Sequence, residues 1–399
     1  MGGYFSLLSG HWRPLGFGLL LMALSCFGQT FFIALFNGEI GAVDHLSAGA
    51  LGACYAAATI GSAFTLRRVG RWLDLMSVRR YALGVAALLC VACIVMGAGR
   101  GWAVLILSFY LLRLAGQGLM VHTALTGTAR RFPQARGKAL GLVSLGLSGG
   151  EAILPGAAIG LIALVGWRNV WFIAAFIVVL VTGLAILLLP ARRSGVRQVL
   201  PRPVPGGAAL WRDPRIYMTM PAVLAGPFFV TGFFFQQTSL LAEKHWPITL
   251  WASMFVAYAV ARAASMLLVG PVIDRIGAAR VLPVFLIPLA VAMATIAFVR
   301  SNWGVPVFLI ATGVTNGITA TLLTALWAEL FGAARLAEVR SSVESANVIA
   351  TALSPIAMGL LIDAGVPLAN QAIIGLLYVA GTIMLVSLSR KILQSYQQS

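Results

Sequence analysis

Acidic residues, and charged residues in general, are scarce in this sequence. Only 11 of its 399 residues are Asp or Glu, and charged side chains make up 10% of the chain, whereas a soluble domain carries roughly 25%. Apolar residues make up 60%, so a soluble fold would expose large apolar patches and aggregate. These proportions exclude a soluble enzyme and a disordered chain, and they indicate a polytopic membrane protein.

Cysteine and histidine are also rare, with four residues of each. Cys26, Cys54, Cys90 and Cys93 all lie inside apolar runs, which is typical of small buried hydrophobic residues. Cys90 and Cys93 have CxxC spacing, but no second pair or histidine cluster completes a metal site. A secreted disulfide scaffold is excluded. We expect no metal, no cofactor and no catalytic residues, and therefore not an enzyme.

Long apolar runs dominate what is present. A membrane-spanning helix needs roughly 20 apolar residues, and the first run, Pro14 to Phe36, is too long for a signal peptide. Breaks at charged, Gly and Pro residues predict an all-α membrane protein with twelve transmembrane helices. Their predicted ranges are 14–37, 46–66, 79–98, 102–128, 137–164, 168–190, 215–240, 249–272, 279–299, 303–328, 338–364 and 367–390.

Basic residues are distributed unevenly between the loops, and the net charge is +17. With both termini inside, 22 Lys and Arg lie on the inner side and four on the outer side, which fits the positive-inside rule. Because the basic clusters are short and no reader motif is present, nucleic acid is not expected as a partner. Residues 191–214, rich in Arg, Pro and Gly, predict a cytoplasmic linker between six-helix bundles at 1–190 and 215–399.

The two halves repeat each other. Gly70 and Gly270, Asp74 and Asp274, Arg80 and Arg280, and Pro155 and Pro355 are each 200 positions apart. Gly118 and Gly317, Phe132 and Phe331, and Arg136 and Arg335 are each 199 apart. Because six helices separate the copies, the halves run parallel, which is a transporter architecture.

These motifs resemble those of the major facilitator superfamily along the whole chain. The run from Gly70 to Arg80 resembles that family's loop 2–3 signature, with Ser77 where a second glycine is usual. Arg113-Leu-Ala-Gly116-Gln117-Gly118 resembles its fourth-helix motif. The resemblance implies a two-lobed carrier that works by alternating access. It also implies a cytoplasmic gate formed by Gly70, Asp74, Arg80, Asp274 and Arg280.

Charged residues inside the predicted spans are few. Insertion scales put the cost of a charge at mid-bilayer at about 2.5–3.5 kcal/mol, so such residues mark function. Arg113, Glu151 and Arg262 fall near the midplane, and Glu344 is shallower. At the corresponding position of the other repeat, each of them is matched by an uncharged residue. These asymmetric charges are therefore the predicted substrate and coupling residues.

Guanidinium groups bind carboxylates through two parallel hydrogen bonds, so Arg262 and Arg113 are predicted to bind an anion. The polar side chains predicted to complete the site are Gln29, Gln117, Gln236 and Asn316. Glu151 is the first choice for the proton carrier and Glu344 the second. Three alternatives remain open: a static Arg113–Glu151 ion pair, pairing of Arg262 with Glu344 or helix carbonyls, and a coupling or structural role for His122.

Two features resemble the monocarboxylate and oxalate/formate-type carriers of the family. One is Gly166-Trp167-Arg168 after the fifth helix, and the other is an arginine in the eighth. Arg262 lies twelve residues before Asp274, whereas those carriers place this arginine about one turn closer. Helix eleven lacks the lysine that oxalate-type carriers place there, which favours a monoanion over a dianion as the substrate.

We therefore expect a secondary active transporter that moves a small organic anion, a monocarboxylate, with protons. The alternative hypothesis is a proton-driven exporter of drugs or other amphipathic compounds, whose fifth-helix Gly-Pro step is missing here. A channel is disfavoured because no filter-like repeat is present. The expected setting is a monomer in a bacterial inner membrane, with both termini cytoplasmic, the lipid bilayer around it, and the anion and protons as partners.

Overall fold

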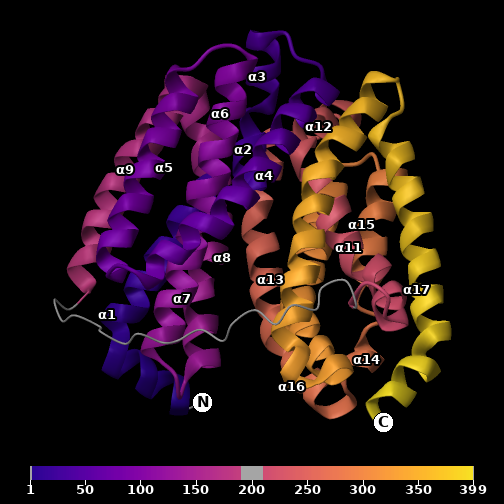
Figure 1. Ribbon diagram of the computed structural model, residues 1–399. Coiled ribbons are helices and arrows are strands. Elements are labelled where there is room, and N and C mark those ends of the chain that lie inside the picture. The colour runs from indigo at the N-terminus through magenta and orange to yellow at the C-terminus, as the bar shows by residue number, and fades with distance from the viewer. Residues whose placement is uncertain (1, 190–209, 399) are drawn as a thin grey trace. The chain divides into compact units, whose positions relative to one another are not determined.

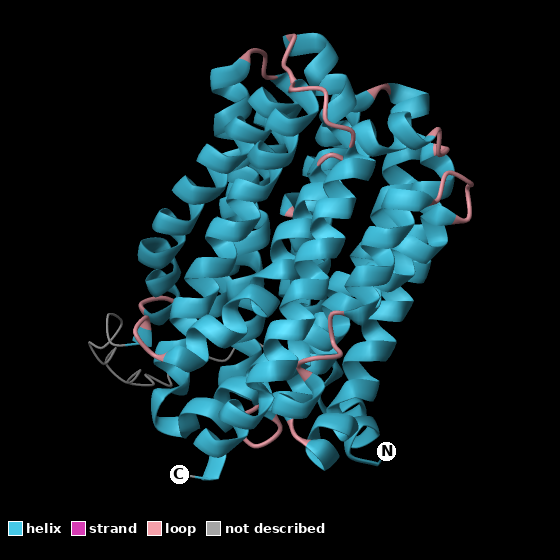
Figure 2. Cartoon of the chain, turned by 90° about the vertical axis from the view of Figure 1, so that its right-hand side faces the viewer, coloured by secondary structure: helices cyan, strands magenta, loops and turns pink. Residues whose placement is uncertain are grey.

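The computed structural model describes residues 2–189 and 210–398, and helices joined by short loops make up this part of the chain (Figures 1 and 2). The chain divides into two compact units, Met1–Val199 and Leu200–Ser399. The predicted linker at 191–214 lies outside the described residues up to position 209, so its bounds stay a prediction.

The first unit begins with a helix that changes type several times. Its elements in chain order are α1 (Gly2–Leu24), η1 (Ser25–Gly28), α2 (Thr30–Ile33), η2 (Ala34–Phe36), α3 (Asn37–Asp44), α4 (Ala48–Val69), η3 (Gly70–Asp74), α5 (Val78–Ala98), α6 (Trp102–Leu112), η4 (Arg113–Met120), α7 (Val121–Arg131), α8 (Arg136–Val165) and α9 (Trp167–Leu188). Within this unit α1 packs against α8, and α5 against α9.

The second unit contains fewer, longer elements. They are α11 (Pro214–Phe235), α12 (Gln237–Lys244), α13 (Ile248–Ile276), α14 (Ala278–Val281), α15 (Ile287–Phe298), α16 (Gly304–Asp363) and α17 (Leu368–Gln398). Helix α16 contains two spans, because Gly332 breaks it with a positive φ of 70° that only glycine adopts without strain. Helix α13 packs along α16.

The membrane spans follow the sequence prediction closely. In the described residues, ten helices are long and apolar enough to cross a membrane, and a pair bent by 46° supplies an eleventh. Ile287–Phe298 is a shorter apolar helix at the position of the predicted ninth span. The prediction of an all-α protein built of transmembrane helices is confirmed for the described residues.

Two of the predicted spans are not continuous, and here the sequence analysis was wrong. The predicted helix 279–299 consists of α14 and α15 with turns at 282–286. Pro283 lies in this turn region, and proline lacks the N–H that a continuing helix needs; Pro288 then lies in the first turn of α15. The predicted helix 14–37 breaks at Gln29, whose backbone is extended (φ −83°, ψ 150°).

The break in the first span coincides with a backbone-to-backbone crossing. A Cβ added to Gly28 would lie 2.2 Å from the carbonyl oxygen of Leu112. A Cβ added to Gly116 would lie 2.7 Å from Cα of Gly28. Gly116 belongs to η4, a π-helical segment, and such segments often occur at functional sites. Two irregular helices therefore meet at two glycines.

Aromatic side chains fill much of the interior of each unit. In the first, Trp171 of α9 is fully buried and contacts the rings of Phe32 and Phe36 at centroid distances of 5.5 and 4.8 Å. In the second, Trp251 stacks on Phe308 at 5.5 Å. In the first unit the rings hold the segment that follows the break at Gln29 in place.

The Gly28–Gly116 crossing predicts a large effect from one methyl group. Gly28→Ala would force the first and fourth spans apart, at a cost of about 1–3 kcal/mol. The matched control is Gly84→Ala in α5, where an added Cβ meets no atom within 4 Å. Thermal unfolding in detergent should show a lower Tm for Gly28→Ala and an equal or higher Tm for the control. Equal Tm values for both variants would contradict the crossing.

Candidate substrate site and helix-end contacts

Arg113 is buried at the start of the π-helical segment, with 5% of its surface exposed. Its Nη1 donates to Thr30 Oγ1 at 3.4 Å, and its Cζ lies 5.2 Å from the ring centroid of Tyr55. The hydroxyls of Thr30 and Tyr55 are hydrogen-bonded to each other at 2.6 Å. Thr30 directly follows the break in the first span. These three residues, from α2, α4 and η4, are called the Arg113 cluster below.

Two buried polar atoms at this crossing make no hydrogen bond within the described part of the chain. They are Nε of Arg113 and Oε1 of Gln117, one turn further along η4. Buried polar atoms are nearly always hydrogen-bonded, because leaving them without a partner costs free energy. Gln29 is half-buried next to Gly28, which contacts the backbone nitrogen of Gln117. Gln29, Arg113 and Gln117 therefore belong to the two segments that cross at Gly28 and Gly116, and their role as a substrate site stays a prediction.

Glu151 lies on α8 in the same unit, and 4% of its surface is exposed. The preceding Gly150 packs on Cys26, where an added Cβ would lie 2.4 Å from Sγ. Glu151 therefore lies beside the segment that precedes the break in the first span. No Arg113–Glu151 ion pair occurs among the described residues, since Arg113 contacts Thr30 and Tyr55 instead.

In the second unit, Arg262 lies half-buried on α13, one turn after Tyr258. The Tyr258 hydroxyl accepts a hydrogen bond from Nδ2 of Asn316 at 2.9 Å. Gly317 lets α16 approach closely, because a Cβ there would lie 2.3 Å from the carbonyl oxygen of Arg262. Asn316 and Arg262 therefore lie at one crossing of α13 and α16.

The structure gives Gln236 a structural partner. Its Nε2 donates to the carbonyl oxygen of Pro355 at 3.1 Å, and only 3% of its surface is exposed. This bond ties the end of α11 to α16. Glu344, the second choice for proton coupling, is exposed on α16, in contrast to the buried Glu151.

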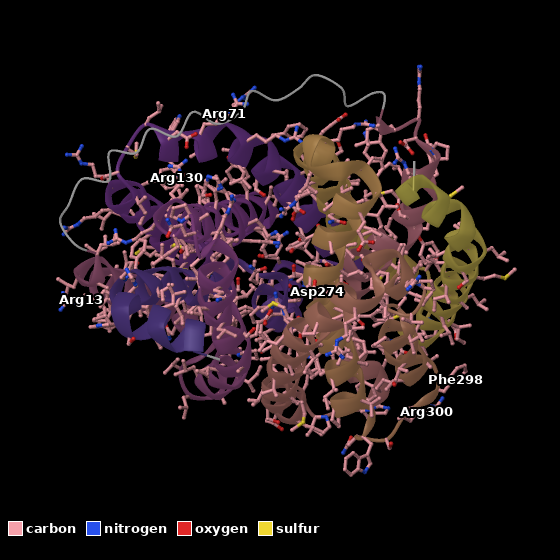
Figure 3. All side chains as sticks on the ribbon, turned by 90° about the horizontal axis from the view of Figure 1, so that it is seen from below. Arg13, Arg71, Arg130, Asp274, Phe298 and Arg300 are labelled. Atoms are coloured by element: carbon pink, nitrogen blue, oxygen red, sulfur yellow. The ribbon has the colours of Figure 1, made fainter. Side chains whose placement is uncertain are left out.

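At the predicted cytoplasmic end of the first unit, Asp74 forms an ion pair with Arg130 of α7. Arg130 is labelled in Figure 3. Arg130 also donates to the carbonyl oxygen of Leu73 at 3.3 Å. The predicted gate residues Arg80, Asp274 and Arg280 are exposed, whereas Gly70 is buried. The ring of His122 lies against Gly70, and its Nε2 is hydrogen-bonded to the Gly70 carbonyl at 3.2 Å.

Arg130 was missed by the sequence analysis, although the repeat contains a signal for it. The residue 199 positions later is Glu329, which accepts hydrogen bonds from the backbone N–H groups of Ala278 and Ala279 at 2.7 and 3.3 Å. A cation thus binds a helix C-terminus in one unit, and an anion binds a helix N-terminus in the other. Each charge complements the dipole of the helix end that it contacts.

Arg168, from the Gly166-Trp167-Arg168 motif, also binds a helix end. Its Nη1 donates to the carbonyl oxygens of Gly97 and Gly99 at 3.1 and 2.7 Å, and its Cζ lies 4.5 Å from the ring centroid of Trp167. The side chain therefore satisfies carbonyl groups at the end of α5. The fold accounts for this motif without a ligand.

A second arginine cluster stands at the start of α11. Arg215 donates from Nε and Nη2 to the Asp213 carboxylate at 3.0 and 2.7 Å. Its Nη1 donates to the carbonyl oxygen of Leu330, and its Cζ lies 4.2 Å from the ring centroid of Phe331. The hydrogen bonds from Arg215 hold the pKa of Asp213 below its ordinary value.

This lowered pKa predicts a pH-dependent contribution to stability. A carboxyl group whose pKa is lower in the folded state stabilises the fold above its unfolded pKa, and that contribution disappears as pH falls through the folded pKa. Asp213→Asn should therefore lower Tm near neutral pH, and the difference from wild type should shrink below about pH 4, near the ordinary carboxyl pKa. Glu39→Gln, at an exposed side chain of α3, is the control. A difference that stays constant down to pH 3 would contradict the ion pair.

Comparison with known proteins agrees with this architecture. The family model described as Major Facilitator Superfamily matches residues 15–252 and 225–395. The crystal structure of the nucleoside transporter NupG aligns with a TM-score of 0.73 at 13% identity, over 96% of this chain and 98% of that chain. The crystal structure of a bacterial homologue of the human lysosomal transporter Spinster, inward-facing and unoccupied, aligns with a TM-score of 0.69 at 15% identity. This alignment covers 97% of this chain and 96% of that chain.

No curated protein gives a significant sequence match. At these low identities the solved structures support the fold alone, whereas the family model covers nearly the whole chain. The chain therefore belongs to the Major Facilitator Superfamily, and it is an integral membrane transporter rather than an enzyme.

Proposed function

We propose that this transporter moves a small organic monoanion, a monocarboxylate, together with protons. The observation that carries the proposal is the buried guanidinium of Arg113, whose Nε has no acceptor in the described part of the chain. A charge inside a membrane segment is costly and marks a substrate or ion pathway. Irregular helix segments form the binding sites of many transporters, and Arg113 lies where two such segments cross.

The charge and shape of guanidinium favour a carboxylate ligand, because its N–H groups match the two carboxylate oxygens. Arg262 is the second proposed anion ligand, since it is half-buried in a span and has no charged counterpart in the repeat. Gln29, Gln117 and Asn316 are proposed to provide neutral hydrogen-bonding groups. We rank Gln236 below them because its amide donates to Pro355.

Glu151 is the proposed proton carrier. Carboxyl groups within membrane segments commonly relay protons in transporters. Glu151 is buried on α8, whereas Glu344 is exposed, so Glu151 is the better placed of the two to exchange a proton inside the membrane. The proposed setting remains the inner membrane of a bacterium, with both termini in the cytoplasm and the chain acting as a monomer.

Arg262→Ala should abolish stabilisation by monocarboxylates without unfolding the protein. A ligand that binds only the folded state raises its stability by about 2.7 kcal/mol at 100 times Kd. Thermal shifts in detergent would compare monocarboxylates with dicarboxylates, nucleosides and lipophilic cations. The control is Arg300→Ala, at an exposed arginine of the same unit. Unchanged stabilisation of Arg262→Ala would exclude its role, and stabilisation of wild type by lipophilic cations alone would favour the exporter.

Glu151→Gln should separate proton coupling from binding. In proteoliposomes this variant should lose uptake driven by a pH gradient but retain exchange of labelled for unlabelled substrate, because Gln cannot release a proton. Glu344→Gln serves as the matched control and should retain both activities. If Glu151→Gln still concentrates substrate along a pH gradient, Glu151 is not the carrier. Loss of gradient-driven uptake in Glu344→Gln instead would move the role to that residue.

A further inference from the structure

We propose that Tyr55, together with Thr30, is a positioning residue that presents the Nε–Nη2 edge of Arg113 to the carboxylate of the substrate. This inference rests on the proposed function of Arg113 as an anion ligand. Neither Tyr55 nor Thr30 is among the predicted substrate-binding residues. The proposal follows from how the guanidinium group is held on two of its sides.

The face of the guanidinium lies against an aromatic ring. Arg113 Cζ is 5.2 Å from the ring centroid of Tyr55, within the range of a cation–π interaction. Tyr55 is fully buried, and its ring packs edge-on against Phe109 at 5.7 Å. Because that ring is held by its own neighbour, it gives the guanidinium group a fixed surface to pack against.

One edge of the guanidinium is held by a hydroxyl pair. Nη1 donates to Thr30 Oγ1, and Thr30 is hydrogen-bonded to the Tyr55 hydroxyl at 2.6 Å. A hydroxyl oxygen has two acceptor sites, so Thr30 Oγ1 has the capacity to accept from both Arg113 and Tyr55. On the opposite side of the group, Nε makes no hydrogen bond to any described residue.

The same arrangement occurs elsewhere in the chain with a carboxylate bound. At Arg215 the guanidinium face lies on Phe331, Nη1 donates to a carbonyl oxygen, and Nε and Nη2 both donate to Asp213. Arg113 matches it in two of three respects: an aromatic ring at the face and an oxygen acceptor at Nη1. At Arg215 the third contact is the Asp213 carboxylate. At Arg113 we assign this third contact to the carboxylate of the substrate.

This geometry gives each group a separate role. The Tyr55 ring sets the plane of the guanidinium, and Thr30 sets its rotation within that plane. A carboxylate then meets two parallel N–H groups, whereas a single-atom anion would engage them less well. Loss of the ring or the hydroxyl should therefore weaken carboxylate binding while Arg113 itself remains present.

The test measures propionate transport in proteoliposomes, with KM and maximal rate separated, and propionate binding by thermal shift in detergent. Propionamide, the uncharged analogue, serves as the negative ligand. Tyr55→Leu removes both ring and hydroxyl and should raise KM at least tenfold, with the maximal rate changed less than threefold. Tyr55→Phe and Thr30→Val, which each lose one hydroxyl, should raise KM about three- to fivefold. Thr30→Ser should restore the wild-type KM.

Tyr110 provides a matched control in the same unit. Its hydroxyl is hydrogen-bonded to Thr65 Oγ1 at 2.8 Å, so Tyr110→Phe removes a Tyr–Thr hydrogen bond of the same kind outside the Arg113 cluster. This variant should keep KM within twofold of wild type. If Tyr55→Leu does not fold, Tyr55→Phe and Thr30→Val still decide the question.

The variant Arg113→Gln distinguishes failure of the positioning role from failure of the proposed function. If it abolishes propionate binding while Tyr55→Phe, Thr30→Val and Tyr55→Leu keep a KM within twofold of wild type, the positioning role is overturned and Arg113 remains an anion ligand. If Arg113→Gln binds propionate as wild type does, or if wild type does not bind propionate, the proposed function fails and the positioning role with it.

Discussion

Inside a bilayer no water is available to satisfy a polar backbone group, so each N–H and C=O must find a partner within the protein. Several side chains described above meet this constraint by binding backbone carbonyl groups. The Pro355 carbonyl accepts from Gln236, the carbonyls at the end of α5 accept from Arg168, and the Gly70 carbonyl bonds to His122. Some side chains that the sequence suggests as substrate ligands therefore hydrogen-bond to backbone carbonyl groups of the protein.

The same constraint makes the Arg113 cluster unusual. Most polar groups in the spans are bound to nearby backbone or to a neighbouring helix, yet this guanidinium is buried and only partly satisfied. It lies at a crossing where glycines allow backbones to touch and where neither helix is regular. Under the proposed function, this arrangement gives Arg113 a defined direction of hydrogen bonding toward the carboxylate of the substrate.

The sequence predicted the regular parts of the fold well. The span predicted at 79–98 is Val78–Ala98, and that at 137–164 is Arg136–Val165, because apolar length and loop charges determine where helices cross a membrane. It did not predict the break at Gln29 or the π-helical segment, since composition and periodicity carry no information on hydrogen-bond register. For the candidate site, the sequence identified Arg113 and Gln117 by charge and motif. It missed Tyr55, because an aromatic residue in an apolar run has no distinguishing pattern.

The opposite charges at Arg130 and Glu329 have a consequence for how far the two halves of the repeat are equivalent. The halves share one sequence pattern, yet at this position each contacts its own helix end with a side chain of opposite charge. Replacing Glu329 alone by arginine would place a cation against the N–H groups of Ala278 and Ala279, where both partners are donors. The charge at this position therefore has to match the helix end within its own half, and the two residues cannot be exchanged singly between the halves.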